Sequence, residues 1–188
     1  MNAIQVLRRD HQAVDHLFDT YAASSTIGLR EELATKLIEE LSVHASIEEE
    51  FVYKPASTRS PLIEKLVLEA VEEHALVKTS LLHLEGLVAA AKDEAQREEK
   101  LDAVVKVLRE LVQLHVEQEH RDFFPELERV MSTAELDALG LVLEEARKTA
   151  PRFPRLPHPQ SSLSRAVDDL VDAGRELLGT ASDAFRRI

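Results

Sequence analysis

Apolar residues recur along the first 130 residues at steps of three and four, the spacing of one face of an α-helix. This spacing predicts helices over about 2–21, 29–53, 61–91 and 96–124. Long helices joined by short polar turns predict an all-α, up-down-up-down four-helix bundle. In each helix a histidine interrupts the apolar face near its middle. These histidines are His11, His44, His74 and His115.

Several residues mark where these helices begin and end. Asn2 is suited to cap the first helix, and Ser60 followed by Pro61 is typical of a helix N-terminus. Because proline lacks the amide that continues a helix, Pro55 together with residues 57–60 is expected to end the second helix, and Pro125 is expected to end the fourth.

The chain continues beyond the bundle. The sequence Ser132-Thr-Ala-Glu135 matches a capping box and predicts a short helix to about Thr149. Prolines then recur from Pro151 to Pro159, which predicts an extended linker. Apolar residues return at helical spacing near the end of the chain, which predicts a C-terminal amphipathic helix. The expected segments are a bundle over 1–131, a short accessory helix over 132–150, a Pro-rich linker over 151–160 and the amphipathic helix over 161–188.

Composition excludes several classes of function. The 188 residues carry a net charge of −12 and contain no Lys/Arg-rich run, so nucleic acid is not an expected partner. Without cysteine the chain can form neither a disulfide nor a thiolate metal site. No run of apolar residues reaches the length of a membrane span, so a cytoplasmic protein is expected. Because its charges are mixed, the C-terminal helix is expected to pack on the bundle or form a homodimer rather than lie on a membrane.

The candidate chemistry lies in two similar motifs, His44-x-x-x-Glu48 and His115-x-x-x-Glu119. Residues four apart share a face of a helix, so each motif can present an imidazole and a carboxylate to one point. Together with His11 and His74 they place six polar groups in the core, where unpaired carboxylates are costly. Either a pair of metal ions or a salt-bridged network without metal would satisfy them. The donor types suit iron, manganese or zinc, and six ligands are too many for one tetrahedral zinc.

The ordered set of motifs resembles the hemerythrin family, the HHE cation-binding domain, over about residues 1–130. The matching elements are Asp10-His11, His44-x-x-x-Glu48, Glu73-His74 and His115-x-x-x-Glu119. The resemblance implies two iron ions joined by an oxo or hydroxo bridge and by the carboxylates of Glu48 and Glu119. It also implies that His11 and His44 bind one iron, and that His74 and His115 bind the other.

One position departs from the oxygen-carrying members of that family. They have a further histidine four residues after the first one on the third helix, and here that residue is Lys78. The set of histidine ligands, smaller by this one residue, resembles that of family members that act on peroxide or nitric oxide, or that act as sensors. The expected function is therefore a di-iron protein that reacts with O2, H2O2 or NO, with catalase-like peroxide decomposition as its enzymatic form. The alternatives are an iron- or oxygen-responsive regulator whose bundle is ordered by iron, and a structural polar core with adventitious zinc.

The remaining polar residues have more ordinary interpretations. Tyr53 could bind ferric iron as a phenolate, but packing at the end of the bundle is favoured. Lys78 could donate a hydrogen bond to a bound ligand, but a snorkelling side chain is favoured. A solvated acidic face is expected for Glu49, Glu50 and Glu117. Surface, packing or linker positions are expected for His16, His83, His120 and His158.

Overall fold

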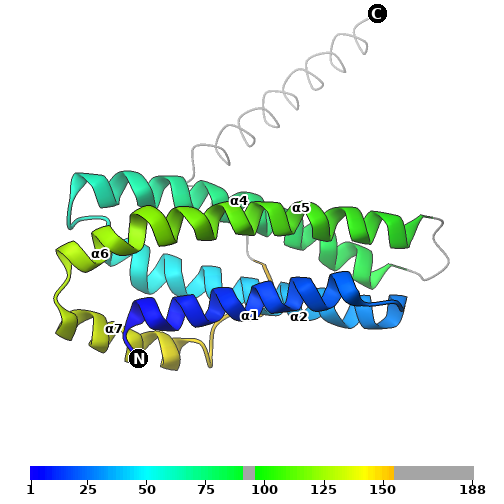
Figure 1. Ribbon diagram of the computed structural model, residues 1–188, viewed down its shortest axis with the longest axis horizontal. Helices are drawn as coiled ribbons and strands as arrows, with labels where there is room; N and C mark the ends of the chain where they lie inside the picture. Colours follow the sequence, from blue (N-terminus) through cyan, green and yellow to red (C-terminus); the bar gives the residue numbers. More distant parts are fainter. Residues whose placement is uncertain (91–95, 155–188) are drawn as a thin grey trace, which may run out of the picture. The chain divides into compact units, whose positions relative to one another are not determined.

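The computed structural model describes residues 1–90 and 96–154, which form a helical bundle (Figure 1). The long helices of this described part are α1 (Ala3–Ala23), α2 (Ile27–Ile47), α4 (Pro61–Ala89) and α5 (Arg97–Gln118). Consecutive long helices run in opposite directions, and α1 packs on α2, α2 on α4, and α4 on α5. The described residues contain no strand. The predicted all-α, up-down-up-down bundle is confirmed.

The predicted helix N-termini are confirmed by their hydrogen bonds. The side chain of Asn2 accepts from the amide of Gln5 at 3.0 Å and thereby caps α1. The hydroxyl of Ser60 accepts from the amide of Ile63 at 3.1 Å and caps α4. These bonds satisfy amides that have no partner within the helix.

The prediction that Pro55 and residues 57–60 end the second helix is confirmed, because its helical residues stop at Ala56, but the prediction that Pro125 ends the fourth helix is wrong. Helix α2 continues as a π-helical segment, η1 (Glu48–Tyr53), and then as α3 (Lys54–Ala56). Helix α5 likewise continues as η2 (Glu119–Phe123) and α6 (Phe124–Val130). The wider π turn is bonded from residue i to residue i+5, and it places Pro55 and Pro125 in the first turn of a new α segment. A local π turn is one way for a helix to continue through a proline, whose ring would otherwise meet the carbonyl four residues earlier.

The buried apolar residues form two clusters, one toward each end of the bundle. Along α1, Leu7 belongs to the first cluster and Val14 to the second, with His11 between them. Along α4, Ala70 and Val77 belong to the two clusters in the same way, on either side of His74. The fold therefore places a polar layer across the bundle, sealed above and below by apolar side chains.

Helix α7 (Thr133–Ala146) lies against α1 (Figure 1). Ser132 and Glu135 form the predicted capping box at its start. Gly140 permits a close approach, because a Cβ at this position would collide with the backbone of Met1 and Asn2. The backbone contact fixes α7 against the N-terminus of α1.

No helix in residues 1–90 and 96–154 is long and apolar enough to cross a membrane. The linker from residue 155 onward, His158 and the C-terminal amphipathic helix predicted over 161–188 lie outside the described residues.

Candidate metal centre

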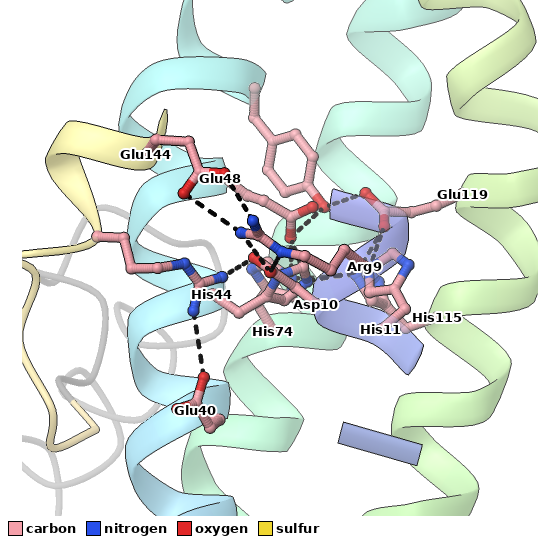
Figure 2. A network of polar contacts seen from close by, with 12 residues as sticks. Arg9, Asp10, His11, Glu40, His44, Glu48, His74, His115, Glu119 and Glu144 are labelled. Atoms are coloured by element: carbon pink, nitrogen blue, oxygen red, sulfur yellow. Dashed lines mark hydrogen bonds and ion pairs between the residues drawn. The ribbon is translucent and has the colours of Figure 1, made fainter. Parts of the chain in front are cut away.

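The six predicted ligands come together in the polar layer between the two apolar clusters (Figure 2). Helices α1, α2, α4 and α5 each contribute one histidine, and η1 and η2 each contribute the glutamate with which they begin. All six side chains are buried: His11, His44, Glu48, His74, His115 and Glu119.

The ligand atoms fall into two groups that share the carboxylate of Glu48. In each group the atoms lie within 4.8 Å of one another, close enough to hold one ion. The first group is His11, His44, Glu48 and Glu119, and the second is Glu48, His74 and His115.

Distances within the groups show how the side chains converge. The Nε2 atoms of His11 and His44 are 3.0 Å apart. Those of His74 and His115 are 3.1 Å apart. Oε2 of Glu48 lies 3.0 Å from Nε2 of His44 and 3.5 Å from Nε2 of His74. One carboxylate oxygen therefore reaches both groups, which is the arrangement that a bridging carboxylate requires.

The chemistry of this donor set fits metal ions. Oε1 of Glu48 is fully enclosed and accepts no hydrogen bond from any described residue. A buried carboxylate oxygen without a donor is costly, and a cation beside it removes the cost. Imidazole nitrogens and carboxylate oxygens without thiolates suit iron, manganese or zinc. The residues present are therefore able to hold a pair of such ions.

The outer nitrogens of His74 and His115 are held by a second layer of side chains. Nδ1 of His74 lies 2.9 Å from Oε1 of Glu49, and Nδ1 of His115 lies 2.8 Å from Oε2 of Glu73. When an imidazole donates its Nδ1 proton to a carboxylate, the Nε2 lone pair is left facing inward for a metal. The second layer thus prepares these two histidines as ligands.

The pKa values in the site are set by burial and by mutual attraction. Burial alone would raise the pKa of Glu48, but the charge of His44 and hydrogen bonds from His44 and His74 lower it well below its usual range. Burial would lower the pKa of His44 and His74, but the charge of Glu48 and hydrogen bonds to it raise both values. The ionised glutamate and the protonated imidazoles thus favour each other, and a cation that binds here competes with protons on the histidines.

Tyr53 packs in the core against Phe123, as predicted, and its hydroxyl also contacts the two glutamates of the site. Its hydroxyl donates to Oε1 of Glu119 at 2.6 Å and lies 3.3 Å from Oε2 of Glu48. Burial and the charges of both glutamates raise its pKa well above the usual value, so the hydroxyl keeps its proton. In an α-helix, residues five apart do not share a face. The π turn of η1 brings Tyr53 back over Glu48, and the sequence alone does not reveal that turn.

Removing this hydroxyl is expected to destabilise the metal-free protein. In Tyr53→Phe a buried oxygen of Glu119 loses its donor, and the free energy of unfolding should fall by about 1–3 kcal/mol. The matched control is Tyr21→Phe, because Tyr21 donates to Asp102 at 2.8 Å, where water can replace it. Urea unfolding compares the two variants. Equal losses would contradict the role given to Tyr53.

Two further predictions are corrected by the second layer. Glu49 was expected on a solvated acidic face, but it bonds to His74 and also accepts from Nζ of Lys78 at 2.6 and 2.7 Å. Lys78 was expected to snorkel, but it is buried with its ammonium group paired to Glu49. A partner on another helix removes the need to reach water. Glu50 and Glu117 are exposed as expected.

Of the other histidines, His16 and His83 are exposed, as expected. His120 is only half-buried, but its Nε2 lies 3.0 Å from Nδ1 of His11, and its Nδ1 lies 3.2 Å from Nη1 of Arg8. The sequence places His120 five residues after His115, away from the ligand face of an α-helix. It therefore gave no sign of this contact with His11.

A small cavity lies beside the histidines, on the side away from Tyr53. The cavity measures about 20 Å³ and is lined by the four histidines and by aliphatic side chains that include Val14, Val77 and Val112. A volume of about 10–15 Å³ on this scale holds one water molecule, so the cavity suits a ligand of about two heavy atoms.

Comparisons with known proteins agree with this geometry. Residues 2–127 match the family model of the hemerythrin HHE cation binding domain. The fold is similar to a crystal structure of a hemerythrin HHE cation binding domain-containing protein from Mycobacterium kansasii. The TM-score is 0.61 with 25% sequence identity, and the match covers 79% of this chain and 89% of that one. Among curated proteins, none matches the chain.

Proposed function

Because the chain belongs to the hemerythrin family of HHE cation-binding domains, we propose that it binds two iron ions and reacts with O2, H2O2 or NO. The observation that carries this proposal is the carboxylate of Glu48, shared between two groups of ligand atoms. In this assignment His11 and His44 would hold one iron, His74 and His115 would hold the other, and Glu48 and Glu119 would supply carboxylate ligands to both.

Six protein ligands divided between two ions leave positions open for a small molecule. Bound iron would supply redox chemistry and a Lewis-acidic position for an oxygen-containing ligand. The cavity beside the histidines is small and its exposed surface is largely apolar, so the chain itself limits a ligand there to about two heavy atoms. This size agrees with O2, NO and H2O2.

The environment of Lys78 favours turnover over reversible carriage of oxygen. In oxygen-carrying hemerythrins this position is a histidine ligand, but here the ammonium group is held by both oxygens of Glu49. Lys78 therefore supplies no ligand, so a metal ion bound here would have one protein ligand fewer than in those hemerythrins. We propose that the enzymatic reaction is peroxide disproportionation, in which two H2O2 give one O2 and two H2O.

An oxygen electrode tests this reaction on the iron-loaded protein. The wild-type chain is expected to release O2 from H2O2 over many turnovers. His74→Ala should lose at least about tenfold in rate because it removes a ligand. The control is His83→Ala, an exposed histidine on the same helix, which should retain the rate.

Two irons per chain without O2 release would contradict the peroxide reaction. Absorption changes on addition of O2 or NO to the reduced protein would then identify a gas-binding centre. Equal rates in His74→Ala and His83→Ala would show that the reaction does not occur at this site.

A further inference from the structure

The contacts made by the outer Nδ1 atoms of the histidines differ between the two groups of candidate ligands. On one side, His74 and His115 each bond through Nδ1 to a carboxylate. On the other side, His11 faces the imidazole of His120, and Nδ1 of His44 has no hydrogen-bond partner among the described residues. Because a carboxylate on Nδ1 makes an imidazole a better metal ligand, the two sides should differ in strength.

A carboxylate does lie near His44, but it is engaged elsewhere. Oδ2 of Asp10 is 3.9 Å from Nδ1 of His44, beyond hydrogen-bond distance. The same oxygen forms an ion pair with Nη2 of Arg147, and Oδ1 of Asp10 lies 3.3 Å from Nη2 of Arg9. Figure 2 shows Asp10 and Arg9 beside the histidines. Two guanidinium groups thus compete with His44 for one carboxylate.

Arg147 comes from outside the part of the chain that matches the family, which ends at residue 127. It directly follows α7, and that helix is fixed on α1 by the close approach at Gly140. A bond of 2.6 Å between Arg9 and Glu144 joins the same two helices, and Glu40 accepts from Nη1 of Arg147 at 3.2 Å. The guanidinium group is therefore held in place rather than free to move off Asp10.

We propose that Arg147 is a positioning residue of the metal centre. By holding Asp10 away from His44, it makes the position between His11 and His44 the weaker of the two metal positions. The inference rests on the proposed two-metal function. Loss of an outer carboxylate typically weakens metal binding by about 10–100-fold, which sets the expected difference between the two positions. The accessory helix α7 thereby controls how readily the second ion is bound and released.

Calorimetric titration of the metal-free protein with Co²⁺, under anaerobic conditions, tests the inference without relying on activity. The wild-type chain should bind two ions in two resolved steps. In Arg147→Gln, Asp10 is free to accept from His44, and the weaker step should tighten by about tenfold while the stronger step is unchanged. Arg147→Met, which keeps the aliphatic stem, should give the same change. The control is Arg152→Gln, which removes an exposed arginine paired to Glu39.

The Asp10→Asn variant distinguishes release of the Asp10 carboxylate from the simple loss of a positive charge on Arg147 that repels the metal ions. In the Asp10→Asn background, Arg147→Gln should leave the weaker step unchanged, because no carboxylate remains to be released. Tightening of the same size in both backgrounds would overturn the inference. Two identical binding steps in the wild-type chain would also overturn it and leave the proposed metal pair intact. Fewer than two Co²⁺ ions per wild-type chain would overturn both.

Discussion

Glu48→Ala is expected to leave the purified chain without bound metal, whereas Glu50→Ala should retain both ions. Glu48 is fully buried and is the one carboxylate that contributes to both groups of ligand atoms found in the described residues. Its loss removes a ligand from each ion and leaves two cations with less neutralising charge. Metal analysis of the purified variants, by inductively coupled plasma mass spectrometry, measures the result.

Glu50→Ala is a matched control because Glu50 lies in the same π segment, has the same side chain and is exposed. Glu119→Ala should also lose metal, since its carboxylate lies 3.3 Å from Nε2 of His11 and 3.7 Å from Nε2 of His115. If Glu48→Ala and Glu50→Ala retained the same amount of metal, the shared-carboxylate assignment would be wrong.

The second large effect is expected from removal of metal. An ion at about a hundred times its dissociation constant stabilises the folded state by about 2.7 kcal/mol, so two ions contribute about 5 kcal/mol. For a chain of this size each kcal/mol shifts Tm by about 2–4 °C. Dialysis against a chelator should therefore lower Tm by about 10–20 °C, as measured by circular dichroism.

Addition of iron should restore Tm in the wild-type chain, while Glu48→Ala should melt at the same temperature with and without the chelator. The comparison separates bound metal from effects of the chelator on the solvent. A wild-type Tm that does not change on chelation would mean that the core histidines satisfy one another without metal.

The fold and the inner layer of the centre could be predicted because both depend on local spacing. Steps of three and four along a helix place His11, His44, His74 and His115 on faces that must be buried. The helix caps at Asn2, Ser60 and Ser132 were predictable for the same reason, since a cap bonds to an amide three residues away. The structure brings together the histidines and glutamates that this spacing selected.

The second layer could not be predicted, because its contacts depend on tertiary structure. Glu49 and Lys78 lie on different helices, and each appeared solvent-facing from its own helix alone. Tyr53 reaches Glu48 and Glu119 through a π turn that no sequence pattern indicated. Arg147 is more than 130 residues from Asp10 and contacts it only after α7 has packed on α1.

The measurement that tests the central claim most directly is the metal content and absorption spectrum of the purified, air-oxidised protein. A centre built on Glu48 and Glu119 predicts two irons per chain and near-ultraviolet bands of an oxo-bridged pair. One zinc per chain without such bands would contradict the di-iron assignment. A chain without stoichiometric metal would show that the buried histidines and glutamates form only a polar core.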